Sequence, residues 1–482
     1  MRFLEILLLV VAAVLPFLLG SSQVKSLRQP LAASMVVLLL AHFFVEGGRW
    51  QMAPIYVLHS IGLFLLLRKA AYFTGGRLRR VVQGFFLLLL LALGATAATA
   101  FPVFELPTPT GPYAAGARYV EVVADAAEPI TPRQDDQRTF VVKIWYPASV
   151  SAESREPYLN EAGRRGFARK YGLPKRTFDY LDRVETHTFL APEVAAGTFP
   201  VLIFSHGYYA NAFGYHALLE DIVSQGFVVL NINHTYESVG TQFLSGEIKF
   251  YDQEYERAHH TAAMAGTVWE ATENFKRATT LEEKRVAIQA LLKEYYAAAI
   301  TARWERDIDE VVRLIPDWAE NSFLAGHLDT TKIGAFGHSQ GGAAVGQALL
   351  NHPKIAAGVN LDGVQWGDLV DRSLSQPFLL VSSDWPDDHP NFNEVAYQRS
   401  GGGDFYSAII RGAGHASFMD IPFLVRLPGL NEAGSIRSAR GIEIAASLVV
   451  GFFNRYLNGA ETSLLQLPAQ YSELEVVRKM GD

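Results

Sequence analysis

The sequence predicts an α/β architecture: a mostly parallel central sheet flanked by helices, with a helical insertion and an N-terminal transmembrane region of four helices. Three observations predict it. Apolar strands alternate with helices from about residue 119 to residue 475, a glycine-flanked serine stands between a strand and a helix at Gly337–Gly341, and long apolar runs are confined to the first hundred residues. A chain of 482 residues is long enough to bury a large core beside such a region.

The charge balance and the absence of cysteine exclude several classes of function. The formal net charge is −7, so no basic field is available to release counterions from a phosphate backbone, and we expect no nucleic-acid partner. With no cysteine, disulfides, thiolate metal sites and a cysteine nucleophile are excluded together. We expect no metal and no cofactor. Nucleophilic chemistry must therefore come from oxygen or nitrogen.

Four apolar runs make up the N-terminal region. Each approaches the roughly 17 to 20 residues that a helix needs to cross a bilayer, given some snorkelling or local thinning of the membrane. The runs cover residues 3–20, 30–45, 52–67 and 81–100. The sequence therefore predicts a transmembrane region over residues 1–100 and an integral protein of the cell inner membrane.

Lysine and arginine are unevenly shared among the short connections between these runs. Lys25 and Arg28 lie in the first connection, Arg49 is alone in the second, and the third contains Arg68, Lys69, Arg77, Arg79 and Arg80. Because positive connections stay in the cytoplasm, the chain after residue 100 should emerge on the extracytoplasmic side. The alternative is a cleaved signal peptide ending near Gly20, Ser21 and Ser22, which would leave three spans.

A proline-rich linker over residues 101–118 follows the last run, and its prolines favour an extended tether. Beyond it we predict a catalytic domain over residues 119–475. The expected strands cover residues 119–123, 140–145, 200–204, 228–232, 333–336, 355–360, 378–382 and 407–410.

The segment 251–299 interrupts this rhythm of strands and helices. It has few turn residues and shows a helical apolar spacing, and Thr280 with Glu283 fits a capping box at a helix start. This segment is predicted to be a helical insertion. It would either cap an active site or pack on the surface.

The motif Gly337-His338-Ser339-Gln340-Gly341 carries the predicted chemistry. It follows an apolar strand and opens an alanine-rich helix, the context in which a serine occupies a strained strand-to-helix turn. Such a turn presents the hydroxyl at a helix N-terminus, where free N–H groups favour developing negative charge. The motif predicts an α/β-hydrolase fold with Ser339 as the nucleophile, against the alternative of a serine that serves only the turn.

A serine nucleophile needs a base, and in this fold the base follows the nucleophile and the acid along the chain. His415 fits, because it sits in the glycine-containing loop Gly412–Gly414 just after the expected strand 407–410. His352 and His389 also lie downstream, but each precedes a proline in what reads as a solvated connecting loop.

The orienting acid has two candidates that spacing does not separate. Asp362 follows the strand 355–360, and Asp384 follows the next strand, 378–382. Either carboxylate could hold the imidazole tautomer and stabilise its charged form. The one that does not would be a helix cap or a turn residue.

An oxyanion hole is expected from two backbone N–H groups. One belongs to Gln340, directly after the nucleophile, and the other to Tyr208, in the loop that follows the strand 200–204. Each such donor contributes roughly 3 kcal/mol to transition-state stabilisation.

Several blocks of the chain, taken together, resemble the platelet-activating factor acetylhydrolase family of the plasma, isoform II type. The likeness runs from about Pro107 to the C-terminal helix. The blocks are Thr108–Tyr113, Trp145–Pro147, Phe204–Gly207, Gly337–Gly342, Asn360–Asp362 and Gly414–His415. The resemblance implies an α/β-hydrolase fold, calcium-independent cleavage of short or oxidised acyl esters of phospholipids, and Asp362 rather than Asp384 as the acid.

Two departures set this chain apart from the familiar animal enzymes of that family. Gln340 stands where they carry phenylalanine, and the four-span region and the helical insertion are additional. The leading hypothesis is therefore a membrane-anchored serine ester hydrolase with an ester or phospholipid substrate. Alternatives are an esterase of non-lipid esters, an acyltransferase that uses the same residues, and a non-catalytic membrane interaction module that retains the hydrolase core.

Overall fold

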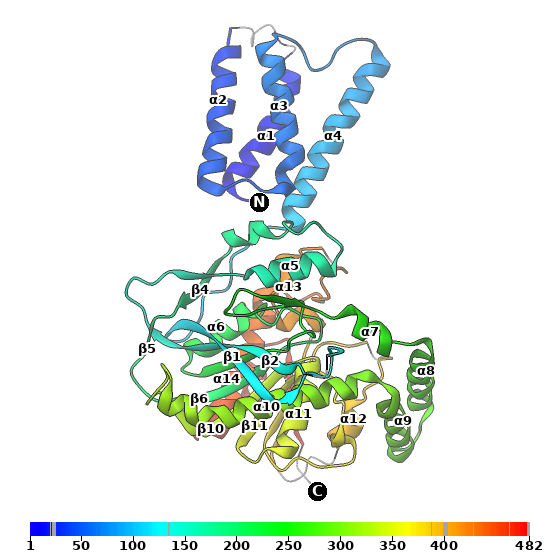
Figure 1. Cartoon of the computed structure of the whole chain (residues 1–482). Coiled ribbons are helices and arrows are strands. Elements are labelled where there is room, and N and C mark those ends of the chain that lie inside the picture. The colour runs from blue at the N-terminus through cyan, green and yellow to red at the C-terminus, as the bar shows by residue number, and fades with distance from the viewer. Residues whose placement is uncertain are drawn as a thin grey trace. The chain divides into compact units, whose positions relative to one another are not determined.

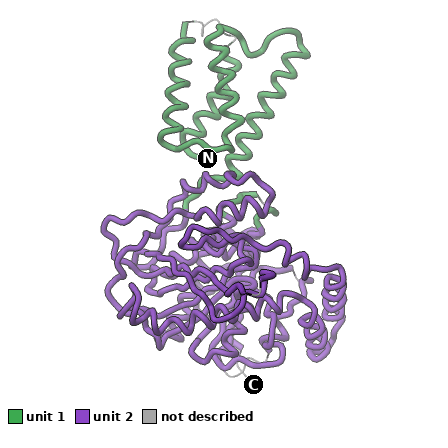
Figure 2. Tube along the Cα trace, viewed as in Figure 1, with its two compact units in different colours: residues 1–105, 423–431 green, residues 106–422, 432–482 purple. Residues whose placement is uncertain are grey.

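The computed structural model describes residues 1–19, 21, 26–133, 135–386, 388–398, 403–427, 429–461 and 463–479. Lys25, Gly20 and Ser22 lie outside these residues. The chain divides into two compact units (Figure 2). The helical unit comprises Met1–Glu105 and Phe423–Asn431, and the sheet unit comprises Leu106–Pro422 and Glu432–Asp482.

Apolar helices build the helical unit (Figure 1). They are α1 (Phe3–Leu18), α2 (Arg28–Ala41), α3 (Ala53–Leu67) and α4 (Arg77–Ala100). With the short turns that adjoin α2 and α3, three segments are long and apolar enough to cross a membrane, namely Arg28–Glu46, Trp50–Leu67 and Arg77–Ala100. The predicted first span corresponds to α1, which is apolar but has only 16 residues.

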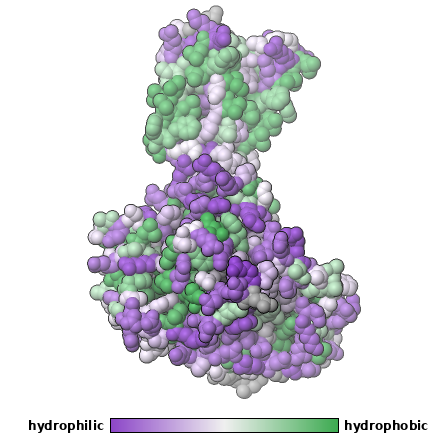
Figure 3. Space-filling model, viewed as in Figure 1, coloured by the Kyte–Doolittle hydropathy of each residue, from purple (hydrophilic) through white to green (hydrophobic). Residues whose placement is uncertain are grey.

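The outward faces of these helices are apolar, as a lipid-facing surface requires (Figure 3). Exposed large side chains on them include Val37, Phe44, Phe64, Val81, Phe85 and Leu88. A buried ion pair lies at one end of the bundle: Arg49 donates to both carboxylate oxygens of Glu5 at 2.7 and 2.9 Å, and to the carbonyl of Ala98 at 3.0 Å. The start of α1 and the end of α4 therefore lie at the same end of the bundle, as expected when four helices alternate in direction.

One large sheet forms the centre of the sheet unit. Its strands are β1 (Ala114–Ala127), β2 (Gln137–Ser149), β3 (Arg155–Pro157), β4 (Glu185–Leu190), β5 (Glu193–Val194), β6 (Phe199–Ser205), β7 (Val228–Asn233), β10 (Leu328–His338), β11 (Ile355–Leu361), β12 (Phe378–Ser382), β13 (Phe405–Ile410) and β14 (Leu474–Lys479). A separate two-stranded ribbon pairs β8 (Gly240–Gln242) with β9 (Ile248–Phe250).

The strand order is β14-β13-β12-β11-β10-β6-β7-β2-β1-β4-β3, with β5 paired to β2. From β7 to β13 every neighbouring pair is parallel, whereas β1, β2 and β14 add antiparallel pairs at the two sides. Strands β6 and β7 are buried at every residue, which explains their uninterrupted apolar sequences. The predicted mostly parallel sheet with flanking helices is confirmed.

Helices cover both faces of this sheet (Figure 1). The helices that follow the helical bundle in the chain are α5 (Glu161–Lys170), α6 (His216–Ser224), α7 (Gln253–His259), α8 (Ala262–Arg277), α9 (Leu281–Glu294), α10 (Tyr296–Asn321), α11 (Gln340–Asn351), α12 (Asn393–Ala396), α13 (Ile421–Leu424) and α14 (Ser438–Asn458). Helices α6 and α14 pack together on the sheet, and α10 and α11 share a core with the strands.

The segment predicted as an insertion folds into α7, α8, α9 and the start of α10. The capping box expected at Thr280 and Glu283 is present at the start of α9. Helix α10 continues well past residue 299 because an apolar stripe that includes Trp304, Ile308 and Val311 is buried against the sheet. The part of the insertion that projects from the core is therefore α7 to α9.

Candidate active site

Ser339 stands on a sharp turn between β10 and α11. Its backbone has φ 57° and ψ −122°, a conformation that strains any residue with a Cβ. The glycines on either side are required by space: a Cβ at Gly337 would lie 2.4 Å from the backbone of Gly341, and one at Gly341 would lie 2.1 Å from the carbonyl oxygen of Ser205. The turn therefore fixes the serine hydroxyl at the N-terminus of α11, where backbone N–H groups are free of helical partners.

His415 joins the serine to a carboxylate. Its Nε2 lies 3.0 Å from Oγ of Ser339, and its Nδ1 lies 2.7 Å from Oδ2 of Asp362. Because an ionised carboxylate only accepts, Nδ1 carries the proton, and Nε2 is left to accept from the serine hydroxyl. The carboxylate is nearly inaccessible, with a side-chain exposure of 1%, whereas the imidazole is 28% exposed. The arrangement can remove a proton from Ser339 at a site that solvent and substrate can reach.

Asp362 is held by several donors besides the imidazole. Oδ1 accepts from the backbone N–H of Ser383 at 2.7 Å and from the indole N–H of Trp385 at 2.9 Å, and the Ser383 hydroxyl lies 2.8 Å from Oδ2. Burial opposes ionisation of this carboxyl, but its bonds with His415 and Ser383 outweigh burial and hold its pKa below the ordinary value. Asp362 is therefore ionised at neutral pH.

The second candidate acid, Asp384, has different partners. Its carboxylate accepts from the backbone N–H of Gly412 at 2.8 Å and from Arg411 at 2.9 Å, and these two contacts lower its pKa. It therefore braces the start of the loop that carries His415 and does not contact the imidazole. The structure brings Asp362 together with Ser339 and His415, and it places Asp384 outside that group.

The other downstream histidines take no part in the contacts that join Ser339, His415 and Asp362, although His389 lies against Trp385, the residue whose indole donates to Asp362. His352 faces Asp309 at 3.0 Å and Glu305 at 3.5 Å, on the far end of α11. His389 stacks on Trp385 with the ring centroids 4.2 Å apart.

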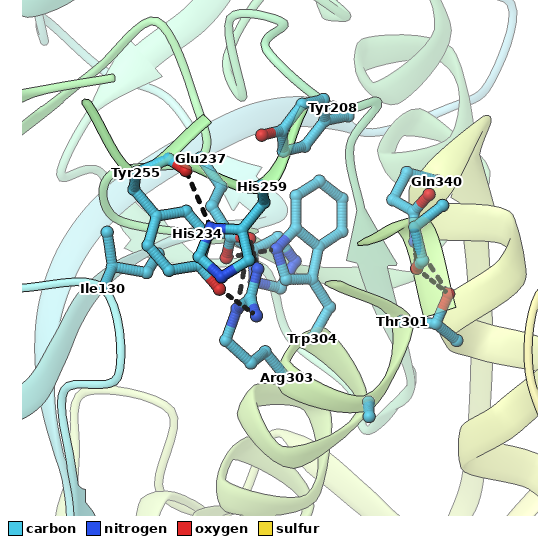
Figure 4. Close-up of polar contacts among 12 residues, drawn as sticks. Ile130, Tyr208, His234, Glu237, Tyr255, His259, Thr301, Arg303, Trp304 and Gln340 are labelled. Atoms are coloured by element: carbon cyan, nitrogen blue, oxygen red, sulfur yellow. Dashed lines mark hydrogen bonds and ion pairs between the residues drawn. The ribbon is translucent and has the colours of Figure 1, made fainter. Parts of the chain in front are cut away.

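The segments that carry the two expected oxyanion donors lie next to the nucleophile. Gln340 begins α11, so its N–H is one of the free groups at the helix start. The loop that holds Tyr208 passes beside the serine, since a Cβ on Gly207 would lie 3.4 Å from Cβ of Ser339. The carboxamide of Gln340 points toward α10 and donates to the hydroxyl of Thr301 at 2.7 Å (Figure 4).

A buried ionic network lies beneath the Tyr208 loop, and it was not predicted from the sequence. Arg138 of β2 donates to both oxygens of Asp307 at 3.0 and 2.7 Å, and Asp307 accepts from Nδ1 of His234 at 2.7 Å. The His234 ring stacks on Trp304 with centroids 4.0 Å apart, and Nε2 lies 2.9 Å from Oγ of Ser205. Arg138 precedes the apolar run 140–145 among polar residues, so its place in the sequence does not indicate burial.

A second ion pair ties α10 to the segment after β7. Glu237 accepts from the guanidinium of Arg303 and from the indole N–H of Trp304 at 2.8 Å (Figure 4). The backbone carbonyl of Glu237 accepts from the N–H of Tyr209 at 2.9 Å. One face of α10 therefore contacts the residues on both sides of the nucleophile.

Comparison with known proteins gives a consistent family. Residues 98–463 match the family model described as platelet-activating factor acetylhydrolase, isoform II. The chain is 25% identical to the platelet-activating factor acetylhydrolase of Gallus gallus, over 67% of this chain and 75% of the relative. It is 24% identical to a probable 1-alkyl-2-acetylglycerophosphocholine esterase of Arthroderma benhamiae, over 57% of this chain and 65% of the relative.

A similar fold is also found among solved structures. The ferulic acid esterase from Streptomyces cinnamoneus matches with a TM-score of 0.61 at 22% identity, over 78% of this chain and all of that one. This likeness shows that the two proteins share an α/β fold.

Proposed function

The chain belongs to the platelet-activating factor acetylhydrolase, isoform II family and is a carboxylic ester hydrolase; on this premise, we propose that it cleaves acyl esters through a covalent intermediate on Ser339. The observation that carries the proposal is the chain of contacts from Ser339 to His415 to Asp362, at 3.0 and 2.7 Å. The distances suit proton transfer without any rearrangement of side chains.

In the first half of the reaction, Oγ of Ser339 attacks the ester carbonyl while Nε2 of His415 takes the hydroxyl proton. Asp362 keeps the remaining proton on Nδ1 and stabilises the imidazolium. The carbonyl oxygen becomes an oxyanion, which the N–H groups of Gln340 and Tyr208 would receive. Collapse breaks the ester C–O bond, and His415 returns its proton to the departing alcohol.

Water completes the cycle. His415, neutral again, removes a proton from a water molecule that attacks the acyl-enzyme, and the same oxyanion donors stabilise the second tetrahedral state. The proton then returns to Oγ of Ser339 as the acid leaves. An alcohol in place of water would give acyl transfer, so product analysis separates the two reactions.

We propose a phospholipid substrate with a short or oxidised acyl chain. The names of the matched relatives, platelet-activating factor acetylhydrolase and 1-alkyl-2-acetylglycerophosphocholine esterase, support this class. Gln340 replaces the phenylalanine of the animal enzymes, and its carboxamide is bonded to Thr301 and to the carbonyl of Ala297. The side chain that follows the nucleophile is therefore polar and bonded to α10.

The decisive experiment measures hydrolysis by the detergent-solubilised protein. Substrates are p-nitrophenyl acetate and phosphatidylcholines with acetyl, oxidised or long acyl chains at one position. Ser339→Ala should lower kcat about 10³-fold or more while the melting temperature holds. Retained activity in Ser339→Ala would overturn the nucleophile, and hydrolysis limited to p-nitrophenyl acetate would overturn the phospholipid substrate.

We also propose that the helical unit anchors the protein in a membrane, with the sheet unit on the extracytoplasmic side. Three helices of sufficient length and the apolar outward faces support an anchor. The cluster of arginines at the end of α3 and in the first turn of α4 supports the orientation.

The absence of cysteine makes this orientation directly testable, since an introduced cysteine is the only thiol. Gly76→Cys labels the α3–α4 connection, where a Cβ meets nothing within 4 Å, and Glu105→Cys labels the exposed chain after α4. On intact cells, an impermeant maleimide should label Glu105→Cys at once and Gly76→Cys only after permeabilisation. The reverse pattern would refute the orientation.

A further inference from the structure

Both peptide groups of Gly207, in the loop beside the nucleophile, are bonded to buried side chains. Its N–H donates to the hydroxyl of Tyr215 at 3.0 Å, and its carbonyl accepts from Nδ1 of His206 at 2.7 Å. Tyr215 and His206 are both fully buried. Neither contact belongs to the sheet or to a helix. The carbonyl of Gly207 also accepts from the backbone N–H of Ala210 at 3.1 Å, whereas the N–H of Gly207 is held by the side chain of Tyr215.

The direction of these bonds fixes the N–H of Tyr208. The carbonyl of Gly207 and the N–H of Tyr208 belong to one trans peptide group, so they point in opposite directions. Holding the carbonyl toward His206 therefore turns the N–H of Tyr208 away from His206. A donor that must meet an oxyanion needs such fixing before the substrate arrives.

The bond with Tyr215 continues toward the base. Since the Tyr215 hydroxyl accepts from Gly207, its one proton is free to go to Nδ1 of His338, which lies 3.0 Å away. Nε2 of His338 then carries the ring proton and donates to the backbone carbonyl of His415 at 2.9 Å. Burial, with His415 nearby, lowers the pKa of His338 to about 3, so the ring is neutral with one proton to give.

In this series of hydrogen bonds, each group can act only as the donor or only as the acceptor of a given bond. A carbonyl cannot donate, so the proton of His338 must lie on Nε2, and Nδ1 must then accept. The result is a one-directional chain from the N–H of Gly207, through Tyr215 and His338, to the carbonyl of His415. It connects the oxyanion side of the site with the backbone of the base.

We propose that Tyr215 is a positioning residue for ester hydrolysis, which holds the Gly207 loop and, through His338, the backbone of His415 in a fixed relation to each other. The inference rests on the proposed function, since it concerns the same reaction. Tyr215 touches no reacting atom; it acts through the loop and the base.

The placement of Tyr215 itself depends on the segment that follows His415. Tyr215 precedes α6, and the carboxylate of Asp420 accepts from the first N–H groups of that helix, those of His216 at 2.8 Å and Ala217 at 3.0 Å. The backbone N–H of Asp420 in turn donates to the carbonyl of Gly214 at 3.0 Å. The base segment and the tyrosine are therefore joined twice, once through His338 and once through Asp420.

The test is Tyr215→Phe in the full-length protein, which removes one hydroxyl and no ring carbon. We expect kcat for p-nitrophenyl acetate to fall about tenfold or more, a loss no larger than that caused by removing one oxyanion donor. KM should change less than about twofold. Affinity for an alkyl trifluoromethyl ketone, which forms a tetrahedral adduct on the serine, should fall in parallel with kcat/KM. A loss of packing alone would not produce that parallel.

The matched control is Tyr146→Phe. Tyr146 is also fully buried, and its hydroxyl donates to the carbonyl of Pro192 at 2.9 Å, but it belongs to β2 and joins nothing in the site. It should retain wild-type kcat. An equal loss in Tyr146→Phe, or a kcat within twofold of wild type in a folded Tyr215→Phe, would overturn the proposal.

If Tyr215→Phe does not fold, a pair at His338 decides the question. A glutamine can accept from Tyr215 and donate to His415, whereas a leucine can do neither. His338→Gln should therefore retain at least tenfold more kcat than His338→Leu, and equal activities would overturn the proposal. Failure of the proposed function is distinct, because the wild type would then lack activity that depends on Ser339.

Discussion

Asp362→Asn tests whether Asp362 is the acid that orients His415, and the hydrogen bonds of Asp362 determine how an asparagine would be placed there. Oδ1 of Asp362 accepts two N–H groups, from Ser383 and Trp385, so the amide oxygen of an asparagine takes that position. The NH₂ group then occupies the place of Oδ2, 2.7 Å from Nδ1 of His415. Two donors cannot face each other, so the imidazole changes tautomer and its Nε2 carries a proton toward Ser339.

The magnitude follows from that change of tautomer. With Nε2 protonated, the base no longer accepts the proton of Ser339, a defect that lowers kcat about 10⁴-fold in serine hydrolases with the same arrangement. This corresponds to about 5 kcal/mol of transition-state stabilisation. Because the substitution preserves shape, the melting temperature should change far less than the rate.

The assay is kcat for p-nitrophenyl acetate between pH 6 and about pH 9, with Asp384→Asn as the matched control. Asp384 is bonded to Gly412 and Arg411 and not to the imidazole, so its substitution should lower kcat by less than about tenfold. A kcat of Asp362→Asn within tenfold of wild type, or a larger loss in Asp384→Asn, would refute the assignment.

Three further predictions concern the surroundings of the site. Gln340→Leu removes two hydrogen bonds with α10 and should lower kcat about threefold to tenfold. The melting temperature should change by no more than a few degrees. An unchanged kcat would show that the carboxamide does not hold the start of α11 in place. Asp307→Asn removes one of the carboxylates paired with the buried Arg138, which keeps Glu128 at 3.0 Å, and should destabilise the sheet unit by up to about 3 kcal/mol, measured by chemical denaturation. Burial opposes ionisation of Asp307, but Arg138 and His234 outweigh it and hold its pKa well below the ordinary value. The contribution of Asp307 to stability is therefore complete above its unfolded pKa of about 3.9 and is lost as pH falls below that value. The free energy of unfolding of Asp307→Asn should therefore depend less on pH in this acid range than that of the wild type.

The local part of the site could be predicted from the sequence because it depends on neighbouring residues. The strained turn at Ser339 needs glycines at fixed positions, and its strand and helix are visible as an apolar run and an alanine-rich stretch. The order of groups along the chain then indicates His415. The mostly parallel sheet is predictable for the same reason, since strands buried on both faces have continuous apolar sequences.

The choice between the two acids could not be made in this way. Asp362 and Asp384 each follow a strand, and β11 and β12 are neighbours in the sheet, so both carboxylates lie at the same edge. What separates them is the backbone after each strand: Asp362 has φ 55° and turns its side chain to His415. A single left-handed residue leaves no signature in the sequence when it is not glycine.

The buried network of Arg138, His234 and Asp307 was missed for a related reason. Its members come from β2, β7 and α10, far apart in the chain, and charged residues in isolation predict exposure. Only the packing of α10 on the sheet makes them partners. The predicted insertion ended at residue 299, within the first turn of α10, whereas the buried stripe of this helix makes α10 part of the core.

The membership of Phe423–Asn431 in the helical unit has a practical consequence for fragment design. Phe423 stacks on Phe104 with ring centroids 6.0 Å apart, and the backbone N–H of Arg426 donates to the carbonyl of Ala100 at 2.8 Å. The chain therefore crosses the boundary between the units after Glu105, before Phe423 and after Asn431. A protease cut or an engineered start at residue 106 would not yield a self-contained hydrolase, because it would strip these partners from a segment that begins eight residues after His415. A fragment that begins before Ala100 retains them.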